Sequence, residues 1–422
     1  MSFFSRYQTN EKIKLIKYNP LSKYYYFMLN NNFYRIKTND INKNEIYIDG
    51  KILLEKKIYL VLNTNKVPKN GYCHIISPNY KDTIISYITD INGDEKYDII
   101  FKDILKNKIL EIKLPHKITV NYVWSPVENA IFYTISQTNR INQLWYLNID
   151  TKENKLIFEE KHIEYFIWIK KSNDNQYLLI NSLSRKTSKC YYYKFISKNK
   201  KNRLNKIRII NKKKTGLKYN GIISYKNYFI ILTNKNCKSK NFKLMCVPKE
   251  NTRIKNWFDL TKNDENINIS HLICSQDYLI LLVQKNGLKN IGIINLKEKI
   301  TKNKTKEIKY LNFQGPIYYI NVKLHNDTNK IIIKYSSYII PLTYYEYDLE
   351  KDNMKVIYDY KLNGYNSELY EIKLLHVPSH DNVNIPISIV YKKEFGKLKD
   401  NPRPFILSAY GSYGSLMECS YS

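Results

Sequence analysis

The stretch Ser125–Ile135, SPVENAIFYTI, decides the fold, because its pattern of a polar turn followed by an apolar strand recurs along the chain. The other copies are PLSKYYYFML from Pro20, SPNYKDTIISYI from Ser77, SNDNQYLLINS from Ser172, SYKNYFIILT from Ser224, SQDYLILLVQ from Ser275 and HNDTNKIIIKYSS from His325. With Ser22 as the first anchor, the spacings are 55, 48, 47, 52, 51 and 50 residues. A repeat of about fifty residues that holds several short strands is typical of a β-propeller.

Strand and turn signals fill the intervals between these anchors. Short runs rich in Ile, Tyr, Val, Phe and Leu alternate with clusters of Asn, Asp, Lys and Gly, and helical periodicity is hard to find. The sequence therefore predicts an all-β fold, a seven-bladed β-propeller whose blades are four-stranded antiparallel sheets with the anchored strand as an inner one. Since Gly and Pro number only 12 each, Asn and Asp are expected to supply the left-handed turn positions. A two-sheet sandwich is the alternative, and it explains the sevenfold register less well.

The regular pattern ends near Tyr360, after an expected closing strand over residues 354–360. We expect an N-terminal extension over residues 1–14, the propeller over 15–365 and a different region over 366–422. This last region contains three apolar runs that are each expected to form a strand: ELYEIKLLHV, NIPISIVYKK and PFILSAYGSYG.

Composition indicates a soluble, cytoplasmic globular protein. Of 422 residues, 43% are hydrophobic, no run approaches the roughly 18 apolar residues of a membrane span, and the N-terminus lacks a secretory signal pattern. None of the six cysteines forms a CxxC pair, so buried or idle thiols are expected; they are Cys73, Cys190, Cys237, Cys246, Cys274 and Cys419. His376 and His380 have HxxxH spacing, but Pro378 lies between them and the flanks indicate strand. No metal or cofactor is expected.

The net charge of +31 would ordinarily indicate nucleic acid or an anionic surface as a partner. The excess is Lys spread along the chain, together with many Asn, Ile and Tyr, which is the composition of an AT-rich coding sequence. The densest basic cluster, residues 198–214 (KNKKNRLNKIRIINKKK), is interpreted as a solvated loop between strands. We therefore expect neither a nucleic-acid partner nor a membrane partner.

Residues 379–418, SHDNVNIPISIVYKKEFGKLKDNPRPFILSAYGSYGSLME, resemble the start of the α/β-hydrolase domain in the prolyl oligopeptidase family, and its oligopeptidase B branch most of all. The matching elements, in order, are the Asp381-Asn382 turn, the strand Ile385–Tyr391, the Asn401-Pro402 turn, the strand Phe405–Leu407 and the loop Tyr410–Gly414. VWSPVENAIFYTI and FEEKHIEYFIWI extend the resemblance into the repeats, so that it covers roughly residues 15 to 420. It implies a seven-bladed propeller that caps a serine endopeptidase for short peptides. The helical stretch that precedes the propeller in family members is not recognisable here.

Peptide hydrolysis of this kind needs a nucleophilic Ser, a His and a carboxylate, and in α/β-hydrolases the Ser lies in a G-x-S-x-G elbow. The twelve glycines form no such motif, so we expect all three triad positions to fall outside this chain, which ends at Ser422. The resemblance places the family's oxyanion-hole tyrosine at Tyr410. A phenol can donate a hydrogen bond to developing negative charge without carrying charge itself.

Two other groups suggest chemistry but are interpreted as structural. Ser379, His380 and Asp381 are adjacent in the sequence, so their side chains point in different directions and cannot form a relay. Asp90, Asp94 and Glu95 lack the spaced ligands of a calcium loop and are expected to form a blade turn.

Two functions therefore remain open. The first is a serine oligopeptidase fragment, inactive alone, whose partners are a short peptide and a missing catalytic half. The alternative is a non-catalytic propeller that binds protein or an anionic polymer. The apolar strands IPISIVY and PFILSAY, expected to lack partners and to expose their edges, favour the first.

Overall fold

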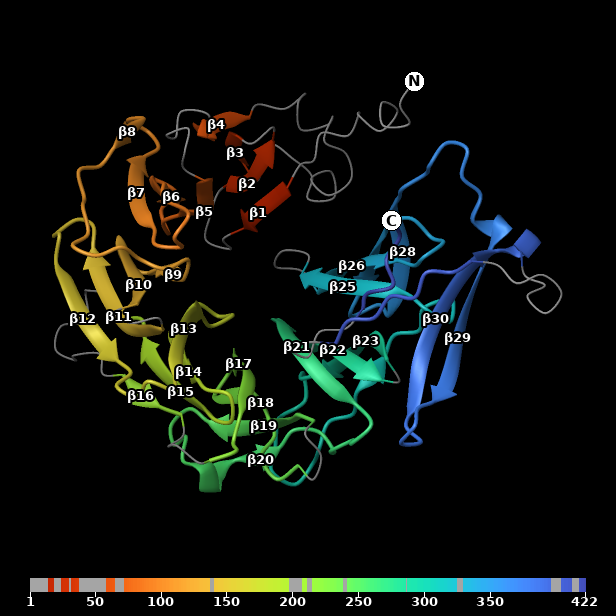
Figure 1. Cartoon of the computed structure of the whole chain (residues 1–422). Helices are drawn as coiled ribbons and strands as arrows, with labels where there is room; N and C mark the ends of the chain where they lie inside the picture. The colour runs from red at the N-terminus through yellow and green to blue at the C-terminus, as the bar shows by residue number, and fades with distance from the viewer. Residues whose placement is uncertain are drawn as a thin grey trace. The chain divides into compact units, whose positions relative to one another are not determined.

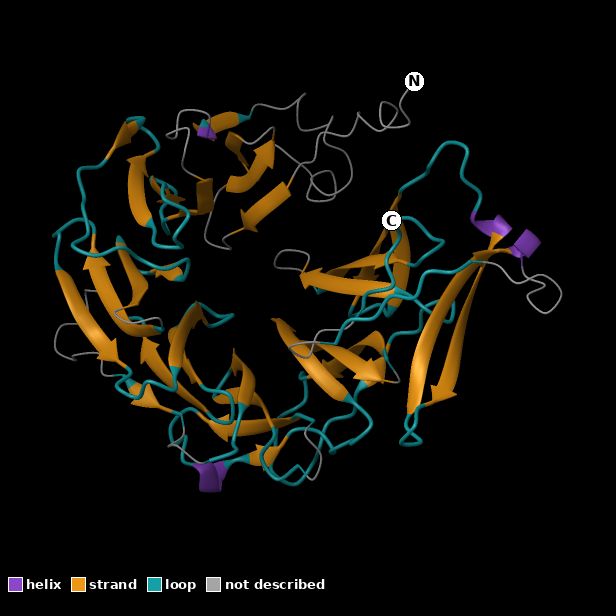
Figure 2. Cartoon of the chain, in the orientation of Figure 1, coloured by secondary structure: helices purple, strands orange, loops and turns teal. Residues whose placement is uncertain are grey.

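The computed structural model describes residues 14–18, 24–29, 32–37, 58–64, 72–136, 140–196, 207–210, 215–237, 241–285, 287–324, 329–395, 404–411 and 417–422. Within this part, the chain consists mainly of strands and loops (Figure 2). It also contains short 3-10 helices, among them η3 (Ile254–Asn256), η4 (Ser367–Leu369) and η5 (Lys393–Phe395). The chain forms two compact units. The first holds Met1–Tyr219, Ser224–Phe229 and Val247–Trp257, and the second holds Asn220–Ile223, Ile230–Cys246 and Phe258–Ser422.

Seven four-stranded antiparallel sheets follow one another along the chain, each made of four consecutive strands (Figure 1). The first two are β1 (Lys14–Tyr18), β2 (Tyr24–Leu29), β3 (Asn32–Lys37), β4 (Tyr59–Leu62), and β5 (Tyr72–Pro78), β6 (Ile84–Asp90), β7 (Asp98–Asp103), β8 (Lys108–Ile109). The next two are β9 (Tyr122–Trp124), β10 (Ala130–Ser136), β11 (Ile141–Asn148), β12 (Asn154–Glu159), and β13 (Phe166–Lys171), β14 (Tyr177–Leu183), β15 (Ser188–Lys194), β16 (Arg208–Ile209).

The last three sheets continue the same meander. They are β17 (Tyr219–Tyr225), β18 (Tyr228–Thr233), β19 (Lys243–Pro248), β20 (Phe258–Asp259); β21 (Asn268–Ser275), β22 (Tyr278–Lys285), β23 (Leu288–Asn295), β24 (Lys309–Tyr310); and β25 (Tyr319–Leu324), β26 (Lys330–Ser336), β27 (Thr343–Asp348), β28 (Asn353–Asp359). The seven sheets are the blades of a seven-bladed β-propeller, as the repeat predicts, and the sandwich alternative is wrong. The closing strand is also confirmed, since β28 covers Asn353–Asp359.

The anchored apolar strand of the repeat is the second strand of every blade, paired on both sides. Its residues are buried on both faces of the sheet, as in β6, where all seven residues are buried, and in β10, where six of seven are. A strand with one wet face would alternate buried and exposed positions. Continuous burial means that each blade is covered on both sides.

Neighbouring blades cover one another through shared apolar clusters. One cluster in the first unit joins the second and third blades through Phe101, Trp124 and Tyr133. Another joins the third and fourth through Phe132, Ile167 and Leu178. In the second unit, a cluster of the same kind joins the sixth and seventh blades.

Asn and Asp supply most of the left-handed turn positions that glycine does not occupy, as predicted. Among the non-glycine residues with positive φ in the described chain, six are Asn or Asp; they are Asp82, Asn107, Asn175, Asn236, Asp352 and Asn382. Glu95, Lys152, Lys226 and Gln276 take the others, which the sequence did not indicate. Tight hairpins impose the conformation on whatever residue occupies the turn.

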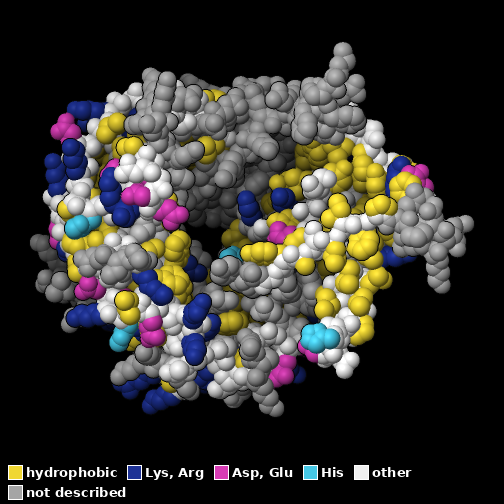
Figure 3. All heavy atoms as spheres, in the orientation of Figure 1, with side chains coloured by type: hydrophobic (Ala, Val, Ile, Leu, Met, Phe, Trp, Pro, Cys, Tyr) yellow, Lys and Arg dark blue, Asp and Glu magenta, His cyan; other side chains and the backbone are white. Residues whose placement is uncertain are grey.

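The region after the blades differs from expectation in two ways. β29 (Tyr370–Pro378) and β30 (Asn384–Lys392) pair along their whole length (Figure 1), so the prediction that IPISIVY lacks a partner is wrong. Residues 404–411 form no strand, so the predicted strand Phe405–Leu407 is wrong as well. The reason is that a strand needs a sheet edge to satisfy its N–H and C=O groups. The hydrophobic side chains of this region gather on the surface (Figure 3).

We predict that Phe132→Ala lowers the free energy of unfolding by about 3–5 kcal/mol, because it leaves a cavity between two blades. Phe132 is fully buried and contacts the rings of Tyr146, Tyr193 and Phe195. The measurement is the shift of the urea unfolding midpoint. Ile163→Ala is the control, since Ile163 is 81% exposed, and equal effects of the two substitutions would contradict the packing described here.

Candidate functional site

Tyr410, the predicted oxyanion donor, lies in the irregular segment 404–411 and is 54% exposed. Its hydroxyl has no hydrogen-bond partner among the described residues. The apolar residues just before it, Phe405, Ile406 and Leu407, are 83%, 94% and 76% exposed. This segment therefore presents a phenol and three large apolar side chains to solvent.

The Ser379-His380-Asp381 group forms the tight turn between β29 and β30. The Ser379 hydroxyl donates directly to the Asp381 carboxylate, and the Ser379 N–H donates to Val383 O at 2.9 Å. A relay needs the His between the Ser and the acid, and here the acid accepts the hydrogen bond from the Ser directly. The interpretation of this group as a turn is confirmed.

Asp90, Asp94 and Glu95 form the turn between β6 and β7. The Asp90 carboxylate accepts hydrogen bonds from the N–H groups of Gly93 (2.7 Å) and Glu95 (3.0 Å). Burial alone would raise the pKa of Asp90, but these backbone hydrogen bonds outweigh it and lower the pKa. Within the described residues, no cluster of three or more His, Cys, Asp or Glu could hold a metal ion.

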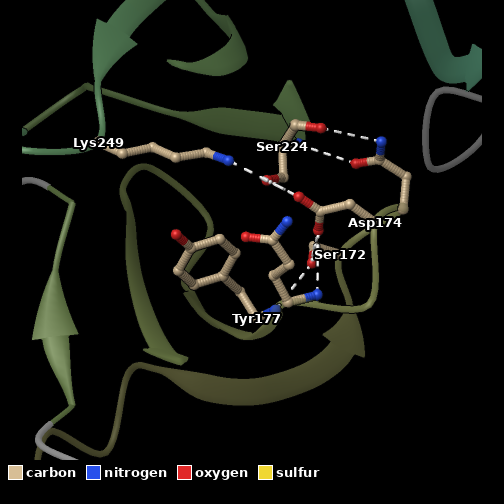
Figure 4. A network of polar contacts seen from close by, with 7 residues as sticks. Ser172, Asp174, Tyr177, Ser224 and Lys249 are labelled. Atoms are coloured by element: carbon tan, nitrogen blue, oxygen red, sulfur yellow. Dashed lines mark hydrogen bonds and ion pairs between the residues drawn. The ribbon is translucent and has the colours of Figure 1, made fainter. Parts of the chain in front are cut away.

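A polar network in the first unit joins the anchor turns of the fourth and fifth blades (Figure 4). Asp174 accepts from the hydroxyls of Ser172 (2.6 Å) and Ser224 (2.5 Å), and its Oδ2 lies 3.7 Å from Lys249 Nζ. The Asn173 amide donates to Ser224 O and accepts from Ser224 N–H, both at 2.9 Å. Asn121 makes the same pair of bonds to the backbone of Ile169 in the next blade.

This network contains Ser, Lys and Asp, but its geometry is structural. Ser224 is 1% exposed and its hydroxyl donates a hydrogen bond to the Asp174 carboxylate, whereas a nucleophile needs access to the substrate and a general base. Burial lowers the pKa of Lys249, although Asp174 opposes this, and the ammonium lies over the rings of Tyr177 and Phe229. The network therefore fastens one blade to the next.

A buried ion pair lies beside the start of β13. Lys189 Nζ is 2.7 Å from Glu160 Oε2, and both side chains are less than a tenth exposed. Glu160 also accepts from the Ser182 hydroxyl (2.6 Å) and the His162 N–H (3.2 Å). Burial alone would raise the pKa of Glu160, but the hydrogen bonds from Lys189 and Ser182 lower it below its ordinary value of 4.5.

Three of the described thiols are poor candidates for a reactive site. Cys190, Cys246 and Cys274 are buried, and burial raises the pKa of Cys190 to about 12. A thiol with a raised pKa is a poor nucleophile. The side chain of Cys73 lies outside the described residues.

Two other expectations concern partners. Most of the basic cluster 198–214 lies outside the described residues, which include only 207–210 of it. Among the helices that the structure describes, none is both long and apolar enough to span a bilayer.

The family model of the prolyl oligopeptidase N-terminal β-propeller domain matches residues 3–359. The chain therefore belongs to the prolyl oligopeptidase family, and its seven blades correspond to the N-terminal β-propeller domain of that family. The match ends at the last residue of β28, so residues 360–422 lie beyond it.

Individual relatives agree with this assignment. The chain is 25% identical over 378 residues to Protease 2 of Moraxella lacunata, covering 88% of this chain and 50% of the relative. It is similar in fold to oligopeptidase B from Leishmania major, with a TM-score of 0.80 at 20% identity, covering 98% of this chain and 57% of the other. Oligopeptidase B from Trypanosoma brucei gives a TM-score of 0.79 over the same shares. The chain thus spans about half the length of the relatives that it matches.

We predict that Glu160→Gln destabilises the chain by about 3–5 kcal/mol at pH 7, because it leaves the Lys189 ammonium buried without a counter-charge. The double variant E160Q/K189M is the matched control and should lose much less. In the folded chain, the pKa of Glu160 lies below its ordinary value of 4.5. The ionised carboxylate therefore makes its full contribution to the free energy of unfolding above about pH 4.5. This contribution is lost as the pH falls through the pKa that Glu160 has in the folded chain. In urea titrations, the gap between wild type and E160Q should therefore narrow below that pH. A constant gap would contradict the pairing.

Proposed function

We propose that this chain is the propeller-bearing part of a serine peptidase of the oligopeptidase B type, which hydrolyses short peptides in the cytoplasm once a catalytic half is present. The propeller spans residues 15–365 and controls access, residues 1–14 are an extension, and residues 366–422 begin the α/β-hydrolase domain. Without the triad, the 422-residue chain alone is inactive.

The observation that carries this proposal is the β29–β30 hairpin, a two-stranded sheet outside the seven blades. On one face, Leu375 and Val377 lie opposite Ile387 and Ile385, and three of these four side chains are exposed. An isolated two-stranded hairpin is marginal in water. The hairpin is suited to become part of a larger hydrolase sheet, in which its apolar face would be covered.

The opposite face of the hairpin already has neighbours within the second unit. Ser388 Oγ lies 3.6 Å from Cys419 Sγ. Pro386 packs close to Gly287, since a Cβ atom added to Gly287 would lie 3.0 Å from the Pro386 ring. The last residues of the chain bond back to the seventh blade, since the Tyr421 N–H donates to Ser336 Oγ at 2.8 Å. One face of the hairpin is therefore used within the unit, and the other remains open.

The exposed segment 404–411 supports the same proposal. A contiguous apolar run at the surface marks a site of interaction, and a finished binding module gains nothing from Phe405, Ile406 and Leu407 in water. In the proposed enzyme, this run adds a strand to the hydrolase sheet. Tyr410 then stands at the end of that strand and donates its hydroxyl hydrogen to the oxyanion of the tetrahedral intermediate.

We predict that the purified chain hydrolyses Arg and Lys ester substrates no faster than a buffer control, because it contains no nucleophile elbow. The measurement is release of the alcohol product followed over hours at micromolar protein. Ser379→Ala is the matched control, because it removes the serine of the only Ser-His-Asp tripeptide in the sequence. Turnover well above the buffer rate that S379A abolishes would contradict the proposal.

A further inference from the structure

A concave pocket in the first unit is lined by four turns of the third and fourth blades and has a volume of about 380 Å³. The turn between β10 and β11 contributes Arg140, and the connection from β12 to β13 contributes Glu164 and Tyr165. The turn between β14 and β15 contributes residues 184–187, and Thr215 lies before β17. Since one water occupies about 30 Å³, the pocket has room for a small ligand.

The charge of the lining is positive. The lining holds three cationic side chains, those of Arg140, Arg185 and Lys186, and one carboxylate, that of Glu164, which leaves two net positive charges. Within the described part of the chain, the Arg185 and Lys186 side chains form no ion pair and no hydrogen bond. Their donors are therefore available to a ligand, unlike those of Lys189, which Glu160 neutralises.

Hydroxyl groups add uncharged donors to the same wall. Thr187 Oγ1 accepts a hydrogen bond from the Gly216 N–H at 3.2 Å, which leaves its own hydrogen to donate. Thr215 adds a second hydroxyl at the pocket wall. Guanidinium, ammonium and hydroxyl donors around one cavity are the groups that bind the oxygens of a phosphate or sulfate.

The walls are held in place before any ligand arrives. Arg140 donates to Glu164 O at 2.8 Å, which fixes the connection before β13, and Glu160 accepts the His162 N–H in the same segment. The turn of residues 184–187 is closed by Ser184 N–H to Thr187 O (2.9 Å) and Thr187 N–H to Ser184 Oγ (3.1 Å). A preformed site loses less entropy on binding.

We infer that this pocket binds a tetrahedral oxyanion with two negative charges, namely the phosphate group of a small-molecule phosphate monoester. The two net positive charges of the pocket match the two negative charges of a phosphate dianion near neutral pH. A ligand with one carboxylate would neutralise only one of the two positive charges. The pocket shares no residue with the β29–β30 hairpin or with the segment that holds Tyr410, so the inference does not depend on the proposed peptidase function.

The test is isothermal titration calorimetry of the full chain with inorganic phosphate, with sodium chloride holding the ionic strength constant. We expect saturable binding at one site, and R185A/K186A should weaken it about tenfold or more because charge-assisted hydrogen bonds are lost. K106A/K113A is the matched control. Both lysines are exposed and lie in the same unit as the pocket, and their substitution removes the same charge as R185A/K186A does. It should leave the affinity unchanged. Inorganic sulfate should bind like phosphate, and acetate should bind much more weakly.

Three results would overturn the inference. No saturable phosphate binding by the wild-type chain would mean that the pocket is not a ligand site. Equal weakening by both double variants would mean that phosphate responds to the overall positive charge alone. Acetate binding as tightly as phosphate would refute selection for a tetrahedral dianion.

Discussion

Each blade has two apolar faces, and this constraint governs the rest of the structure. The second strands are buried on both sides, so a single four-stranded sheet would leave both of its apolar faces in water. Full burial of a large apolar side chain is worth about 1.5–3 kcal/mol, and stacked blades obtain this from one another. Polar groups at the borders between blades must then find partners there. Asn121 and Asn173 meet that need by bonding to the backbone of the following blade.

The sequence predicted what depends on local pattern and repetition. The spacing of the anchors predicted the number of blades and the position of the second strand. This was possible because a polar turn followed by an apolar run is a local pattern that a stretch of about ten residues contains in full. The fate of Phe405–Leu407 could not be predicted in this way, since an apolar run becomes a strand only where a sheet edge accepts it. The pairing of IPISIVY with β29 was missed for the same reason, because the available partner decides the outcome.

Candidate sites were still harder to predict. Asp174 and Ser224 are fifty residues apart and meet only because successive blades stack, although their equivalent positions in the repeat were a signal that could have suggested contact. The cationic pocket draws on four turns between Arg140 and Thr215, and no contiguous motif marks it. Tyr410 was found through the family resemblance alone. Its surroundings in this chain consist of exposed apolar residues rather than catalytic groups.

The central claim is that the blades bury one another's apolar faces, whereas Phe405, Ile406 and Leu407 in the segment that follows them stay exposed. Hydrogen–deuterium exchange of the intact chain, read by mass spectrometry, tests it most directly. The account predicts strong amide protection in the second strand of every blade and exchange at nearly the free-peptide rate over residues 404–411. Blade-like protection of residues 405–407, or free exchange in any of β6, β10, β14, β18, β22 or β26, would contradict it.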